Sequence, residues 1–114
     1  MTIAAVVLSL VLAAAMLGSG TMKLLRTPQM LAQVGVVHVT PAQTPVLGAI
    51  EVAATVGLVV GLFWTPIGIA AAIGAVIYFV GAVVAHVRAH DRGFVPALVL
   101  ALLSVATLVV LILR

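Results

Sequence analysis

The chain alternates between four long apolar runs and short polar stretches. A helix that crosses the hydrocarbon core of a bilayer needs about 20 mostly apolar residues, and each run is close to that length. The runs cover residues 2–22, 46–63, 67–85 and 94–113. We therefore predict an all-α fold, a polytopic membrane four-helix bundle that forms a single transmembrane domain over residues 1–114.

Threonine–proline pairs mark the positions where helices are expected to begin. Threonine caps helix N-termini, and proline suits the first helical position because its missing N–H would be unpaired there. Thr27-Pro28 opens a short segment, Gln29 to Val34, which stops at Gly35. We predict a short interfacial helix there, between spans 1 and 2. Thr65-Pro66 is expected to open span 3 in the same way.

The start of span 2 has two candidates. Thr40-Pro41 precedes Gln43, which lies where the second residue of a capping box is found. Thr44-Pro45 is an alternative start of the same helix. At the other end of the span, only Trp64 to Pro66 separate it from span 3, so these two spans form an antiparallel hairpin.

Composition identifies lipid as the solvent for most of this surface. The chain is 66% hydrophobic and 6% charged, with a mean hydropathy of +1.49, whereas a soluble domain carries roughly 25% charged residues. Five basic and two acidic residues form no clustered basic face, so nucleic-acid binding is not expected. The absence of cysteine excludes disulfides and thiol chemistry in this chain. Ala13-Ala14-Ala15 resembles a signal-peptide cleavage site, but the first run lacks a basic leader and exceeds the usual length, which favours a span.

The basic residues predict how the spans are oriented. Lys23, Arg26, Arg88 and Arg92 flank the first and third connections, which lie on one side of the membrane, whereas Arg114 lies on the other. Lys and Arg concentrate in cytoplasmic loops. We therefore expect both termini outside, and a reporter fused after Arg114 that is cytoplasmic would contradict this.

Glu51 is the most informative residue, because an ionised carboxylate inside the hydrocarbon is costly unless it is paired or hydrated. Lys23 at the end of span 1 and His86 near the end of span 3 are candidate partners on the same side. Gly48 and Thr55 share the helix face of Glu51 and leave room beside it. Two interpretations remain open: a structural pair that fixes helix register, and a proton-titrating or ligand-binding site.

Tyr78 completes the candidate ligand or proton site of Glu51, Lys23 and His86. Its depth along span 3 allows a hydrogen bond to Glu51. However, side chains lean toward the N-terminus of their own helix, so groups on antiparallel helices lean apart, and we rank Tyr78 below Lys23 as a partner.

A second polar group, His86, His90 and Asp91, contains a His-x3-His spacing that places both imidazoles on one helix face. A metal site needs three or four ligands with supporting hydrogen bonds. We favour an interfacial polar cluster at a helix end, and expect no metal.

Small residues predict close helix packing. Gly57 and Gly61 are spaced by four residues in span 2, and Gly74 belongs to a series of small residues in span 3. Such spacing lets helix backbones approach one another in membranes. The face of span 2 that carries Gly57 and Gly61 is rotated from the face that carries Glu51, so one face can pack while the other presents the carboxylate.

These features resemble the DoxX-like family of small four-helix membrane proteins over essentially the whole chain. The matching motifs are Gly-Ser-Gly-Thr-Met-Lys-Leu at 18–24, Leu-Gly-Ala-Ile-Glu at 47–51, the run 57–63 before Trp-Thr-Pro, and Gly81-Ala82 followed by His86. The resemblance implies a polar set of Lys23, Glu51 and His86 and a multi-pass protein of a bacterial cytoplasmic membrane. It also implies a place beside membrane oxidoreductases, since family members occur as a subunit of thiosulfate:quinone oxidoreductase and in a membrane complex with superoxide dismutase and a thiol-transfer protein.

Three functions follow as expectations. The first is an accessory subunit of a membrane oxidoreductase complex, with a quinone or lipid pocket around Glu51 and protein partners that supply the chemistry. No catalytic residue is assigned, because this chain has no cysteine and no haem-ligand pair, so a partner or a bound quinone would handle electrons. The second is a structural or assembly protein without a ligand. The third is a proton-coupled transporter like the small multidrug resistance proteins, although their membrane-embedded Glu lies in the first span and not in the second.

Overall fold

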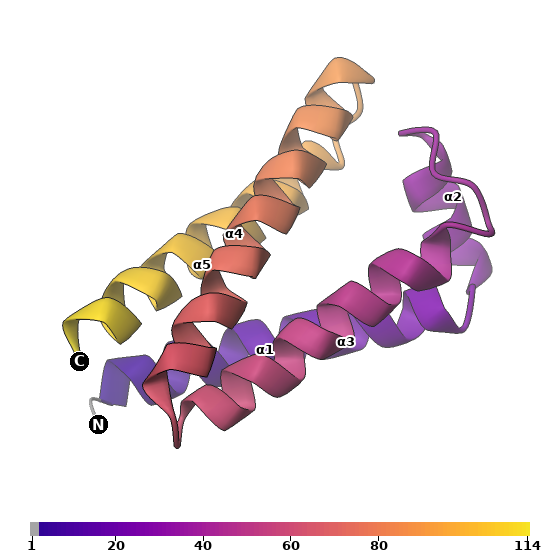
Figure 1. The fold of residues 1–114 in the computed structure, drawn as a ribbon. Coiled ribbons are helices and arrows are strands. Elements are labelled where there is room, and N and C mark those ends of the chain that lie inside the picture. Colours follow the sequence, from indigo (N-terminus) through magenta and orange to yellow (C-terminus); the bar gives the residue numbers. More distant parts are fainter. Residues whose placement is uncertain (1–2) are drawn as a thin grey trace.

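The computed structural model describes residues 3–114, which form four long helices and one short helix (Figure 1). They are α1 (Ile3–Leu24), α2 (Pro28–Gly35), α3 (Thr44–Gly61), α4 (Thr65–Arg88) and α5 (Phe94–Leu113). Each long helix has the length and apolar composition needed to cross a membrane. The predicted four-helix membrane bundle, with a short helix between spans 1 and 2, is confirmed.

The long helices are arranged as two antiparallel pairs, α1 with α3 and α4 with α5. The pairs meet through α3–α4 and α1–α5 contacts. In Figure 1 they lie close together near the turn between α3 and α4, and diverge toward the end of the bundle that carries α2. The connection after α4 lies at that same diverging end.

Apolar side chains occupy both the inside and the outside of the bundle, as expected for a protein solvated by lipid. The largest buried ones include Leu12, Met16, Leu58 and Leu111. Most of the outward-facing apolar residues, such as Val56 and Leu102, are exposed along the lengths of the helices. Among the described residues, eight polar or charged side chains are buried as well, and the charged ones, Lys23 and Glu51, require a specific explanation.

Two of the predicted helix starts have the expected capping hydrogen bonds. The Met30 N–H donates to Thr27 Oγ1 at 3.3 Å, so Thr27 caps α2. Gln43 N–H donates to Thr40 Oγ1 at 3.2 Å, and Thr40 N–H donates to Gln43 Oε1 at 3.1 Å, which is the reciprocal pattern of a capping box. The α-helix α3 begins at Thr44, one turn after Thr40. Thr40 therefore supplies the capping box, and Thr44 is the first helical residue.

The start of α4 differs from the prediction. Trp64 occupies the N-cap position without a side-chain capping bond, and Thr65 lies inside the first turn. Two helix ends also extend beyond the apolar runs, because α1 continues to Leu24 and α4 to Arg88.

At the end of the bundle that carries the turn between α3 and α4, the Arg114 guanidinium donates to Gly61 O at 3.2 Å and Leu62 O at 3.3 Å. This cation therefore caps the C-terminal carbonyls of α3, where the helix dipole favours positive charge.

Three helices end in turns of the same kind, each with a left-handed residue that is not glycine. Arg26, His38 and His90 have φ values of 50°, 68° and 55°. In each case the next residue closes a six-to-one hydrogen bond, as in Val39 N–H to Val34 O at 3.2 Å and Asp91 N–H to His86 O at 2.9 Å. Side chains with a Cβ pay a conformational penalty in this region, so these turns are locally strained.

We expect His38→Gly to raise the free energy of unfolding by about 0.5–1 kcal/mol, because the relief of left-handed strain exceeds the added flexibility of the unfolded chain. Thermal unfolding in detergent measures the effect. Val36→Gly is the matched control, since Val36 is also exposed but has a φ of −59°. Equal destabilisation by both substitutions would contradict the prediction.

Candidate functional site

Two glycines bring α1 and α3 into backbone contact. A Cβ built on Gly48 would lie 2.6 Å from Gly20 O, and one built on Gly20 would lie 2.9 Å from Gly48 O. Any larger residue at either position would push the helices apart. Lys23 and Glu51 each follow one of these glycines by three residues, so the contact holds the two charged side chains side by side.

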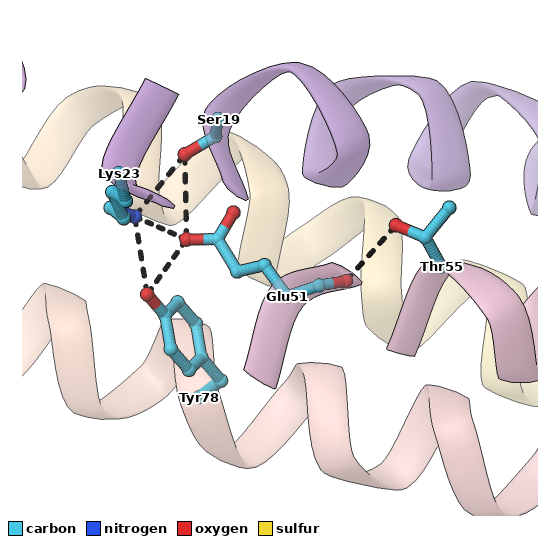
Figure 2. Close-up of polar contacts among 5 residues, drawn as sticks. All are labelled: Ser19, Lys23, Glu51, Thr55 and Tyr78. Atoms are coloured by element: carbon cyan, nitrogen blue, oxygen red, sulfur yellow. Dashed lines mark hydrogen bonds and ion pairs between the residues drawn. The ribbon is translucent and has the colours of Figure 1, made fainter. Parts of the chain in front are cut away.

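Four polar side chains converge at this point, as Figure 2 shows. Lys23 Nζ forms an ion pair with Glu51 Oε1 and also donates to Ser19 Oγ at 3.2 Å and to Tyr78 OH at 3.1 Å. The Tyr78 hydroxyl donates to Glu51 Oε1 at 2.7 Å, and the Ser19 hydroxyl lies 3.4 Å from the same oxygen. We call Ser19, Lys23, Glu51 and Tyr78 the carboxylate cluster. It joins α1, α3 and α4.

Burial makes this pairing obligatory. Glu51 is 1% exposed and Lys23 is 8% exposed. An isolated charge at such a position would cost several kcal/mol, whereas a hydrogen-bonded pair avoids most of that penalty. Among the described residues, Glu51 Oε2 is buried and has no hydrogen-bond partner, so the donors gather on one oxygen of the carboxylate. Thr55 supports the helix beneath it by donating to Glu51 O at 3.0 Å and to Ala13 O at 3.3 Å.

The predicted contact between Lys23 and Glu51 is present, and so is the lower-ranked contact between Tyr78 and Glu51. The antiparallel lean of the side chains does not prevent the second contact, because the long phenol side chain reaches the carboxylate from α4. Ser19 was not identified from the sequence. Its position four residues before Lys23 on the same helix face was the available signal.

His86 does not join the carboxylate cluster, so the Glu51–His86 pairing considered from the sequence is wrong. Its Nδ1 lies 2.6 Å from Asp91 Oδ2, which also accepts the Gly93 N–H at 3.0 Å. His90 is exposed and left-handed beyond the end of α4, so it does not share a helix face with His86 as the spacing predicted. No group of three metal-ligating side chains is found in residues 3–114.

A cavity of about 300 Å³ connects the two polar groups. Ser19, Lys23 and Tyr78 line it at one position, and His86 and Gly93 line it at another. Its walls are mostly apolar and come from α2 and the turn after it, together with α3, α4 and α5. They include Met30, Val34, Leu47, Phe79, Ala97 and Leu100. We call this space the main cavity.

The packing glycines behave in two ways. A Cβ on Gly61 would overlap the Gly68 backbone, and a Cβ on Gly57 would lie 2.8 Å from Ala71 Cβ, so both positions permit the α3–α4 contact. Gly74 does not lie at a close helix contact, because a Cβ there would meet nothing within 4 Å. It borders a second space of about 230 Å³ beside Glu51. The packing role predicted for Gly74 is therefore not observed.

This geometry defines a small four-helix membrane protein with a buried, charge-balanced cluster beside a partly open cavity. Residues 7–109 match the DoxX-like family, and the chain belongs to that family. No curated protein and no solved structure matches the chain.

Proposed function

We propose that this protein is an accessory subunit of a membrane oxidoreductase complex and that its main cavity holds the headgroup of a quinone. The supporting observation is the cavity itself, which has mostly apolar walls and two separate polar groups. Small-molecule sites are usually apolar clefts with a few placed polar groups. The volume of about 300 Å³ also exceeds the roughly 150 Å³ that accommodates a benzene ring in an apolar protein cavity.

Charge balance favours a neutral ligand. The Lys23 ammonium is neutralised by Glu51, and the Asp91 carboxylate beside His86 adds no positive charge that an anion could use. An anionic lipid phosphate needs an unpaired cation or several free N–H donors, and arginine usually supplies them. No arginine lines the main cavity. Quinones and their reduced hydroquinones are neutral, and each combines a ring that carries two polar oxygen groups with an apolar tail that suits the lipid.

Gly81 offers a direct test, because it lines the main cavity and a Cβ there meets nothing within 4 Å. We expect Gly81→Leu to fill the cavity and lower the quinone recovered with the purified protein at least tenfold, with little loss of folding. Organic extraction followed by mass spectrometry measures bound quinone. Gly18→Leu is the matched control, since Gly18 is also helical and uncrowded but lies outside the cavity. Equal quinone recovery from both variants would reject the proposed pocket.

The complex is tested by copurification from native membranes in mild detergent, with partners identified by mass spectrometry. An oxidoreductase subunit that accompanies the chain supports the proposal, and a solitary chain without quinone rejects it. A ligand-free structural role is a second candidate, because the hydrogen bonds of the carboxylate cluster are made among its own members. That role predicts that Gly81→Leu leaves both the complex and its activity unchanged.

A further inference from the structure

The hydrogen positions in the carboxylate cluster follow from its chemistry. An ionised carboxylate only accepts hydrogen bonds, so Tyr78 and Ser19 both donate to Glu51. The ammonium of Lys23 has three N–H groups, and these point to Glu51, Ser19 and Tyr78. All donors of the cluster are therefore in use. The Tyr78 and Ser19 oxygens keep unused lone pairs, so this part of the main cavity offers acceptors.

The hydrogen position on His86 follows in the same way. Asp91 Oδ2 already accepts the Gly93 N–H, and a carboxylate has no hydrogen to give. The 2.6 Å contact therefore requires that His86 Nδ1 is the donor. In the singly protonated ring, Nε2 then carries a lone pair. Nε2 makes no hydrogen bond within residues 3–114, and His86 lines the main cavity.

From these two assignments we infer that the main cavity selects the hydroquinone form of its ligand over the quinone form. This inference rests on the proposed function. A hydroquinone has hydroxyl groups on opposite sides of its ring, and each can donate to an acceptor. A quinone has carbonyls, which would face lone pairs and lose the hydrogen bonds they make with water. His86 determines the specificity, and Asp91 is a positioning residue that fixes the ring hydrogen on Nδ1.

The binding test uses a decyl-substituted benzoquinone and its hydroquinone, titrated under anaerobic conditions into the purified full-length protein in detergent. The Gly81→Leu variant supplies the background from micelle partitioning. We expect the hydroquinone to bind about tenfold more tightly, as one satisfied rather than unsatisfied polar contact would produce. Equal binding of both forms overturns the inference and leaves the proposed pocket standing. Binding of neither form overturns both.

Two variants separate selection from general stability. His86→Leu should clearly reduce the preference while the quinone still binds, because the acceptor for one of the two hydroxyls is lost and the Ser19 and Tyr78 oxygens remain for the other. His90→Asn is the matched control, since His90 is exposed, does not line the main cavity and adopts a left-handed conformation that asparagine tolerates. Retention of the full preference in His86→Leu overturns the inference.

Nuclear magnetic resonance of the ¹⁵N-labelled wild-type protein reads the tautomer directly, even if the variants fold poorly. At mildly alkaline pH we expect the His86 ring to carry its hydrogen on Nδ1. In Asp91→Ala, the hydrogen should move to Nε2 in part of the population, and the hydroquinone preference should fall with it. A wild-type ring that carries hydrogen on Nε2 overturns the assignment and the inference together.

Discussion

Lys23→Met should lower the free energy of unfolding by about 3–5 kcal/mol, which is the usual cost of removing one partner from a buried ion pair. The substitution keeps an unbranched side chain of similar length but leaves the Glu51 carboxylate without its counter-charge at a position that is 1% exposed. Tyr78 and Ser19 still donate to Glu51, but neutral donors do not balance its charge. Reversible unfolding in mixed micelles, followed by the fluorescence of the single tryptophan, measures the loss.

The double variant Lys23→Met/Glu51→Leu should recover most of that stability, because an apolar pair of similar volume is often as stable as the ion pair it replaces. The resulting double-mutant cycle isolates the coupling between the two side chains. Arg88→Met is the control for a loss of positive charge, since Arg88 is exposed at the end of α4. A coupling energy near zero would show that the contact contributes nothing to the fold. Loss of quinone in a stable double variant would show that the pair serves the ligand.

The spans and the central pair could be predicted from the sequence because lipid imposes strict requirements on both. A membrane span can be recognised from the length of an uncharged apolar run, and a carboxylate buried within a span, such as Glu51, needs a partner. Chain direction alone places Lys23 at the same end of the bundle as Glu51. The hydropathy pattern does not show where α1 and α4 end. The turns containing Lys23 and His86 extend past the apolar runs, because backbone hydrogen bonds and not apolarity decide where a helix ends.

The sequence places His86 and Asp91 in one polar cluster at a helix end, but the contact between their side chains could not be predicted, for a related reason. Asp91 lies five residues after His86, beyond the helix, and reaches the imidazole only because His90 adopts a left-handed conformation. Gly93 is also required, since a Cβ there would lie 2.7 Å from His86 Nδ1. The main cavity depends on how far the two helix pairs diverge, and that angle is set by side-chain packing across several helices. No local pattern in the sequence records it.

Alanine substitutions at the helical glycines should change stability very differently at crowded and at open positions. We expect Gly48→Ala to cost about 3 kcal/mol or more, at the upper end for overpacking, because its Cβ would lie 2.6 Å from Gly20 O and 2.9 Å from Leu24 N. Both neighbours are backbone atoms, so no side chain can rotate away. Gly61→Ala should be similarly costly, since its Cβ would meet the Gly68 backbone. Unfolding in mixed micelles measures both.

Gly18→Ala and Gly74→Ala are the matched controls, because a Cβ at either position meets nothing within 4 Å. Each should leave stability unchanged or raise it by about 0.5–1 kcal/mol through reduced flexibility of the unfolded chain. Equal losses at Gly18 and Gly48 would refute the proposed helix contact. The two crowded positions should also differ from each other in ligand binding. Gly48→Ala separates α1 from α3 beside Lys23 and Glu51 and should release quinone, whereas Gly61→Ala acts at the far end of α3, so the variant protein that still folds should retain it.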